Sequence, residues 1–157
     1  MVLHRHGIRL DAAALARNAL VPDYLGPDHT DPARRNALGF QSWNDLARGG
    51  GVWVNPPYQP TQDLRGFLGR AAATAAAGTE VAALVPYSPA TRWWSETVEA
   101  PAARVEVVGR LAYGGPHSNG GRAPWASALL VYEPQRGLVD RLLRAGGAPL
   151  SLLRSLL

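Results

Sequence analysis

The chain has 157 residues, of which 46% are hydrophobic and five are tryptophan, so it is long and apolar enough for one domain with a packed core. It contains no cysteine, which excludes disulfides, thiolate zinc sites and a cysteine nucleophile, and which fits a reducing cytoplasm. No segment reaches the roughly 18 apolar residues that a membrane span needs. The polar start of the chain does not resemble a secretory signal.

The net charge is +4, and all 16 basic residues are arginine. A guanidinium group binds phosphate through two parallel hydrogen bonds, so this charge favours a nucleic-acid partner. An arginine-rich chain without lysine, with abundant alanine and glycine, is also what a GC-rich coding sequence produces. The charge alone therefore leaves both explanations open.

The first third of the chain predicts two strands separated by irregular structure. Residues 8–12 form an apolar run that ends in an acidic residue and a following alanine, and we expect a first strand there. Segment 20–39 is rich in proline, aspartate and glycine, which predicts a loop with little regular structure. Three glycines at 49–51 then lead into a short apolar strand at 52–54.

Residues 61–77 carry the clearest helical pattern. Thr61 stands where a side-chain cap is expected, Asp63 lies in the first turn, and Gly78 follows as a stop signal. The apolar positions recur with a period of 3.6 residues, which predicts one stripe packed on a sheet. These positions are Leu64, Phe67, Leu68, Ala71, Ala72 and Ala75.

The second half of the chain predicts three further strands. The run at 81–85 is continuously apolar, as in a strand covered on both faces. Ser88 and Pro89 are expected to open a short helix that continues to residue 98. Strands are predicted at 104–111 and 125–132, and the glycine-rich loop between them is too short for a helical crossover, so they should pair antiparallel.

Strands that alternate with helices indicate an α/β fold with a mostly parallel sheet and a C-terminal antiparallel hairpin. We expect a single domain over residues 1–157. A last helix is predicted at 138–145, within a helical tail at 135–157.

Asn55-Pro56-Pro57-Tyr58 is the most informative motif, because it directly follows the strand at 52–54. This position predicts a stiff turn at the carboxyl end of the sheet, where open α/β sheets bind ligands. The Asn55 side-chain oxygen and the Pro56 carbonyl can accept hydrogen bonds from an exocyclic amine, and Tyr58 can stack on a flat base. The alternative is a turn without chemistry.

Other motifs in the same order and spacing complete a resemblance to the phage-type DNA N-6-adenine methyltransferases, the Dam-like family, over about residues 7–134. The resemblance implies a methyltransferase-like fold with helices on both faces of the sheet, S-adenosylmethionine as cofactor and adenine in double-stranded DNA as substrate. It also implies a phage or prophage gene expressed in the cytoplasm of a bacterial host, in the setting of restriction and modification. The other motifs are Leu10-Asp11-Ala12-Ala13-Ala14, Leu84-Val85-Pro86-Tyr87, Thr91-Arg92-Trp93-Trp94, Gly109-Arg110-Leu111 and the run 123–132.

The resemblance assigns catalysis to Asn55, Pro56, Pro57 and Tyr58. It assigns cofactor contacts to Asp11, Ala12, Ala13, Trp43 and Asn55. An aspartate at a strand end is also often a helix cap, so a capping role for Asp11 stays open. Trp43 precedes a core strand, where an aromatic residue is more often a packing residue.

Five residues are predicted to contact DNA: Arg92, Trp94, Arg110, His117 and Arg122. Trp93 and Trp94 are adjacent on a predicted helix, so only one of them can face the sheet, and the other is left for a surface role. Arg110 could instead pair with Glu106 or Glu133. The four histidines are scattered, so we expect no metal site.

Two features depart from the family pattern. Only ten residues precede Asp11, whereas family members usually carry a longer stretch with a Thr-Pro that holds the methionine end of the cofactor. We therefore expect a shortened N-terminus and a cofactor pocket that is incomplete or completed by a partner subunit. The tail ends with five leucines in its last eight residues, which predicts docking on the core or on a second copy as a homodimer.

Three functions remain open from the sequence. The first is methyl transfer to adenine in DNA. The second is a catalytically weakened relative that binds DNA or cofactor without turnover. The third is a methyltransferase that acts on RNA or on a protein glutamine, because the same four residues can hold any planar NH2 group.

Overall fold

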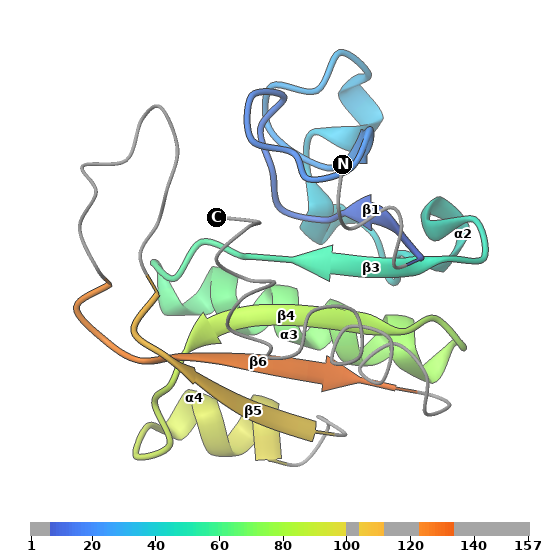
Figure 1. Ribbon diagram of the computed structural model, residues 1–157. Coiled ribbons are helices and arrows are strands. Elements are labelled where there is room, and N and C mark those ends of the chain that lie inside the picture. Colours follow the sequence, from blue (N-terminus) through green and yellow to red (C-terminus); the bar gives the residue numbers. More distant parts are fainter. Residues whose placement is uncertain (1–6, 100–103, 112–122, 134–157) are drawn as a thin grey trace.

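The computed structural model describes residues 7–99, 104–111 and 123–133, and its centre is a six-stranded sheet in the order β2-β1-β3-β4-β6-β5 (Figure 1). The predicted helix at 138–145, the leucine-rich tail, His117 and Arg122 lie outside the described residues. No described helix has the length and hydropathy needed to cross a membrane.

The sheet is parallel at one end and antiparallel at the other, as the sequence predicted. Strand β1 pairs in parallel with β2 and β3, and β3 pairs in parallel with β4. Strand β6 lies antiparallel between β4 and β5, which makes β5 and β6 the expected hairpin. The strands are β1 (Ile8–Asp11), β2 (Asp23–Tyr24), β3 (Gly51–Val54), β4 (Val81–Pro86), β5 (Arg104–Gly109) and β6 (Ser127–Tyr132).

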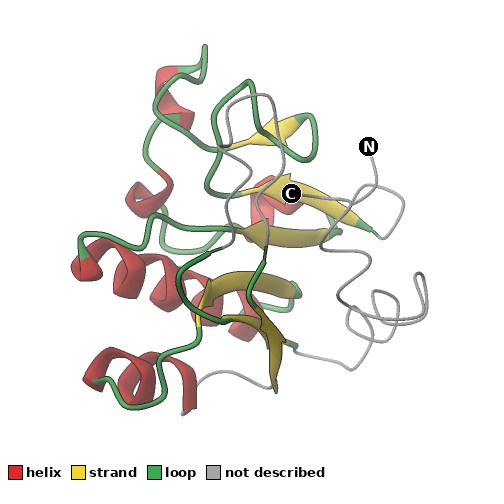
Figure 2. Cartoon of the chain, turned by 60° about the vertical axis from the view of Figure 1, so that its left-hand side comes forward, coloured by secondary structure: helices red, strands yellow, loops and turns green. Residues whose placement is uncertain are grey.

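Helices α3 (Thr61–Ala76) and α4 (Arg92–Trp94) lie against one face of the sheet (Figure 2). Successive strand residues point to opposite faces, so Val52 and Val54 of β3 pack into the core on the helix side. Trp53 faces the other way and is 2% exposed, so it belongs to the core on the second face. Within the described part of the chain, the helices pack on the first face only, so the expected cover on both faces is found on one.

Helix α3 confirms the predicted stripe with two differences. Leu64, Phe67, Leu68, Ala71 and Ala75 are buried, but Thr74 is the sixth buried position and Ala72 lies at its margin. The Thr74 hydroxyl accepts a hydrogen bond from the backbone N–H of Trp43 at 2.9 Å, so its polar atom is satisfied in the core. Thr61 is the first helical residue and makes no cap, because Pro60 occupies the N-cap position.

One local prediction was wrong in its bounds. The helix expected from Ser88 begins at Arg92, since Ser88 and Thr91 close a turn with a backbone hydrogen bond of 3.0 Å. It then continues as a π-helical turn, η3 (Ser95–Glu99). The segment 20–39 is mostly irregular, but it contributes β2 and two 3-10 turns, η1 (Pro32–Arg34) and η2 (Ala37–Gly39). A four-residue helix, α2 (Asn44–Ala47), precedes β3.

Candidate functional site

Asn55-Pro56-Pro57-Tyr58 leaves the carboxyl end of β3, where the sequence placed it. The pairing of β3 with β4 ends at Val54 and Ala83, so the chain departs from the sheet at Asn55. The Tyr58 hydroxyl donates a hydrogen bond of 2.9 Å to Oδ1 of Asn55. The two Pro residues restrict the backbone, and this side-chain bond fixes the amide relative to the ring.

The loop after β1 runs beside this turn because backbone hydrogen bonds attach it to β3 on one side and to the segment after β2 on the other. The N–H of Ala12 donates to the Trp53 carbonyl at 2.8 Å, and the N–H of Ala14 donates to the Leu25 carbonyl at 3.0 Å. The N–H of Leu25 returns to the Asp11 carbonyl at 2.8 Å. The alanines are thereby held between β3 and the segment that follows β2.

A cavity of about 380 Å³ lies between this loop and the Asn55–Tyr58 turn. From β1 the chain first adds β2 on one side and later β3 on the other, so the carboxyl ends of β1 and β3 form a topological switch point. The cavity lies at that point, where open α/β sheets bind their ligands. It is lined by Ala13, Ala14, Leu15, Asn18, Pro27, Asn55, Pro56, Pro57 and Tyr58.

Asp11 lies behind the cavity and does not line it. Its carboxylate is 3% exposed and accepts hydrogen bonds from the backbone N–H groups of Ala13 at 3.3 Å and Leu20 at 3.1 Å. Burial raises the pKa of Asp11 from 3.8 to about 6, and the bonds from Leu20 and Ala13 limit that rise. The carboxylate therefore shapes the loop that forms one cavity wall, a role close to the capping alternative.

Sequence reasoning missed three residues that build this wall. Asn18 accepts a hydrogen bond from the N–H of Leu15 at 2.7 Å, and the Asp28 carboxylate accepts from the N–H of Ala16 at 3.0 Å. Gly26 passes so close to the loop that a Cβ there would lie 1.6 Å from the Ala14 carbonyl oxygen. The turn residues of segment 20–39 were visible in the sequence, but their partners in the loop were not.

Trp43 does not reach the cavity. Its side chain is 0% exposed, its ring lies 6.2 Å from that of Phe67, and its indole N–H donates to the Ala37 carbonyl at 3.0 Å. The structure thus assigns Trp43 to packing between α3 and η2, the alternative that the sequence had left open.

The aromatic residues around α4 are arranged the opposite way from the prediction. Trp94 is 3% exposed and packs edge-on against Tyr87, with ring centroids 5.3 Å apart, whereas Trp93 is only partly buried. Trp94 is consequently the residue that faces the core, and it is not available to DNA. Helical spacing predicted that one of the pair is buried but not which one.

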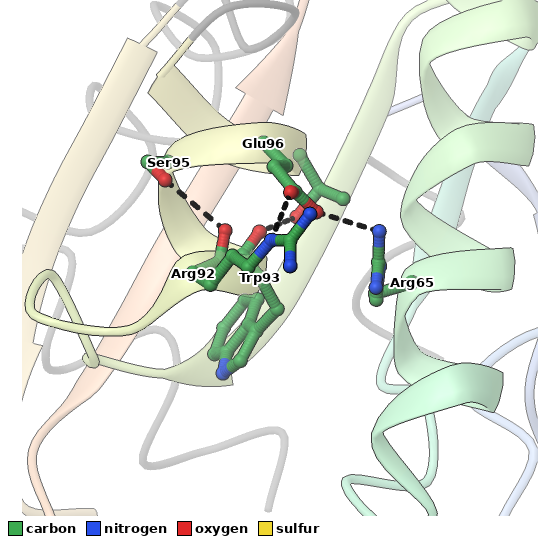
Figure 3. Close-up of polar contacts among 6 residues, drawn as sticks. Arg65, Arg92, Trp93, Ser95 and Glu96 are labelled. Atoms are coloured by element: carbon green, nitrogen blue, oxygen red, sulfur yellow. Dashed lines mark hydrogen bonds and ion pairs between the residues drawn. The ribbon is translucent and has the colours of Figure 1, made fainter.

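Arg92 is exposed on the first turn of α4, where an ion-pair network holds it (Figure 3). Its Nε donates to Glu96 at 2.6 Å, and Glu96 also accepts from Arg65 of α3 at 2.6 Å. The hydrogen bond and charge of Glu96 raise the pKa of Arg92. A DNA phosphate would have to compete with Glu96 for this guanidinium.

Arg110 directly follows β5 and is exposed. Trp125 is also exposed and lies two residues before β6. Its ring packs edge-on against that of Tyr58, with the ring centroids 6.3 Å apart. Within residues 7–99, 104–111 and 123–133, no cluster of three or more His, Asp or Glu side chains could hold a metal ion.

Comparison with known protein families assigns residues 2–132 to the DNA N-6-adenine-methyltransferases (Dam). A search of curated proteins found no match. The matched segment contains β1 to β6, the Asn55–Tyr58 turn and the cavity beside it. The family match covers most of the chain, and the sheet with its antiparallel carboxyl strands agrees with a methyltransferase-like α/β fold. The chain belongs to the family of DNA N-6-adenine methyltransferases.

Proposed function

We propose that this protein transfers a methyl group from S-adenosylmethionine to the exocyclic amine of adenine in double-stranded DNA. The observation that carries the proposal is the stiff Asn55–Tyr58 turn, which presents an amide and an aromatic ring beside a cavity at the topological switch point of the sheet. Family membership supports adenine in DNA as the substrate.

The cavity residues fit S-adenosylmethionine as the donor. The cavity volume of about 380 Å³ lies within the range of roughly 300–1,000 Å³ that is usual for small-molecule sites. Ala13 and Ala14 have small side chains that let a ligand approach the backbone, and Asn18 contributes an amide. The buried carboxylate of Asp11 adds negative charge behind Ala13, which favours the cationic end of this molecule. When bound, the cofactor supplies an electrophilic methyl group on a sulfonium.

Asn55 and Pro56 accept hydrogen bonds from the amine of the adenine substrate. The adenine lone pair is delocalised into the ring, so the amine is a poor nucleophile until its nitrogen becomes pyramidal. Asn55 Oδ1 has two acceptor positions, of which Tyr58 uses one, and the second can accept from the amine. The Pro56 carbonyl accepts the other N–H. Both acceptors stabilise the positive charge that develops on nitrogen, and the surplus proton then passes to water.

Tyr58 has two roles in this proposal. Its ring offers a face to the adenine, which must leave the duplex to reach Asn55, and stacking offsets part of that unstacking cost. Its hydroxyl holds the Asn55 amide in the orientation that presents the oxygen. Arg92 and Arg110 are exposed and are proposed contacts to the DNA backbone, a role that carries no sequence information.

The test is methyl incorporation from labelled S-adenosylmethionine into unmethylated duplex DNA. Wild type and Gln62→Ala, which removes an exposed amide from α3, should place label in N-6-methyladenine, and Asn55→Ala should not. Label in added RNA or in protein glutamine instead would contradict the proposed substrate. Binding of DNA and cofactor by calorimetry without any incorporation would contradict catalysis and favour a binding relative.

A further inference from the structure

A second hollow, of about 370 Å³, lies toward the amino ends of the parallel strands β1, β2 and β3. It is lined by Arg9 on β1, by Pro22 and Asp23 at the start of β2, and by Arg48 between α2 and β3. These residues differ from those that line the cavity beside Asn55. Two guanidinium groups and one carboxylate give the lining an excess of positive charge, which suits an anionic ligand.

The backbone of Arg48 adopts the left-handed conformation, with φ 49° and ψ 44°. Among the residues other than glycine that the structure describes, Arg48 alone has a positive φ. Glycine and asparagine adopt this conformation more easily, so an arginine at this position costs stability. Residues in such conformations cluster at ligand sites, where the fold holds a side chain in place despite the strain.

Gly50 leaves room for the side chain of Arg9. A Cβ at position 50 would lie 2.1 Å from Cγ of Arg9 and 2.7 Å from the Gly7 carbonyl oxygen. The N–H of Gly51 donates to the same carbonyl at 2.8 Å, and the N–H of Gly50 donates to the Ala47 carbonyl at 2.9 Å. The stem of Arg9 therefore packs on a turn that hydrogen bonds hold in place, and this contact orients the side chain that lines the hollow.

Asp23 holds two arginines unequally. Arg34 donates a hydrogen bond of 3.2 Å to Asp23, whereas Arg48 lies 3.7 Å from that carboxylate, which is longer than a hydrogen bond. The Arg48 side chain is also 68% exposed, against 16% for Arg34. Arg34 thus compensates the charge of Asp23, and Arg48 can turn its donor groups to a better acceptor.

We propose that the second hollow binds a phosphate group between the guanidinium groups of Arg9 and Arg48. A guanidinium donates two parallel hydrogen bonds to phosphate, a stronger interaction than an ion pair at 3.7 Å. Free phosphate, a phosphate ester and the nucleic-acid backbone share this chemistry. The site is independent of the proposed methyl transfer, because its residues are not those of the first cavity.

The test follows thermal unfolding at constant ionic strength while inorganic phosphate replaces chloride. A ligand that binds only the folded state raises Tm, and the dependence on its concentration gives Kd. Arg48→Asn tolerates the left-handed backbone but lacks the guanidinium, so it should fold as well as wild type and bind phosphate about tenfold more weakly. Asp23→Asn removes the competing carboxylate and should bind phosphate more tightly than wild type.

Arg110→Gln is the matched control, because it removes an exposed arginine beside β5, at the opposite edge of the sheet from β2, and should leave phosphate binding unchanged. An equal rise in Tm in wild type and Arg48→Asn, or no rise in wild type, would overturn the inference. Anisotropy with a fluorescent 12-base-pair duplex then identifies the source of the phosphate. Weaker duplex binding by Arg48→Asn assigns the site to the nucleic-acid backbone, and unchanged duplex binding assigns it to a small phosphate compound.

Discussion

Two hollows of nearly equal size lie near β1, and they differ in chemistry. The first, of about 380 Å³, lies at the carboxyl ends of β1 and β3 and includes Asn55 and Tyr58. The second, of about 370 Å³, is lined by Arg9, Pro22, Asp23 and Arg48. Volume alone would rank them as equivalent candidates.

Charged side chains line most of the second hollow. Asp23 pairs with Arg34 at 3.2 Å and with Arg48 at 3.7 Å, and it lies on the two-residue strand at the margin of the sheet. Charged side chains do not line the first hollow, which combines amides, a tyrosine ring and backbone held by hydrogen bonds. Fixed neutral acceptors beside an aromatic face, and not empty volume, therefore distinguish the first hollow as the proposed site.

Replacing Asn55 should have the largest effect. Asn55→Ala removes the acceptor for the amine and should lower kcat by roughly 100- to 1,000-fold, the usual loss for one well-placed polar group in an active site. Asn55→Asp keeps the acceptor at Oδ1, replaces the NH2 by a second acceptor oxygen, and should retain a measurable rate. Single-turnover methylation checks both variants, and an inactive Asn55→Asp with normal cofactor affinity would show that the amide N–H2 is also required.

Gly26→Ala should damage the wall of the first hollow. The added Cβ would lie 1.6 Å from the Ala14 carbonyl oxygen, and both groups belong to backbone that hydrogen bonds hold in place. We expect a loss of about 3 kcal/mol or more in the free energy of unfolding, together with weaker cofactor binding. Gly69→Ala is the control, because a Cβ on that exposed position of α3 meets nothing within 4 Å and should stabilise by about 0.5–1 kcal/mol.

For Gly26→Ala and Gly69→Ala, urea unfolding measures the free energy of unfolding, and calorimetry measures cofactor affinity. Unchanged cofactor affinity in a folded Gly26→Ala protein would mean that the wall near Ala14 does not form part of the cofactor site.

Asp11 should make stability depend on pH. The pKa of Asp11 is about 6 in the folded protein and 3.8 for an ordinary aspartate, so the carboxyl group binds its proton more tightly in the folded state than in the unfolded state. The stabilising contribution is complete below pH 4 and is lost as the pH rises through 6, a change of about 3 kcal/mol at about 1.4 kcal/mol per pKa unit. Asp11→Asn should remove this part of the pH dependence, and identical pH profiles in the two proteins would contradict it.

The sequence predicted the wall of the cavity formed by Asn55 and Tyr58 better than the opposite wall. Asn55 and Tyr58 lie in one short motif after a strand, so their position depended on local signals that the sequence contains. Asn18 and Pro27 reach the cavity through contacts such as that between Ala14 and Leu25, which leave no local pattern.

The same limit explains the errors at tryptophan. Periodicity shows that an aromatic residue can be buried, but it cannot choose between neighbours such as Trp93 and Trp94. It also cannot tell that the Trp43 indole finds its acceptor at Ala37, inside the core. These choices depend on tertiary contacts between distant segments.

Tyr58→Phe separates the two roles of the tyrosine. The ring remains, but the hydrogen bond to Asn55 is lost, and kcat should fall by roughly 3- to 10-fold, the usual value of one such bond. The KM for DNA should change little, whereas Tyr58→Ala should raise it as well. Steady-state kinetics checks this, and a faster Tyr58→Phe enzyme would mean that the hydroxyl competes with adenine for Asn55.

Asp23→Asn should have the smallest effect. The substitution keeps the shape of the side chain and weakens its ion pairs with Arg34 and Arg48, but such pairs near the surface contribute only about 0–1 kcal/mol. The methylation rate and cofactor affinity should equal those of wild type, because the second hollow has no part in the proposed chemistry. A tenfold loss of cofactor affinity in a protein of normal stability would instead connect the two hollows through β1, and the distinction between them would then fail.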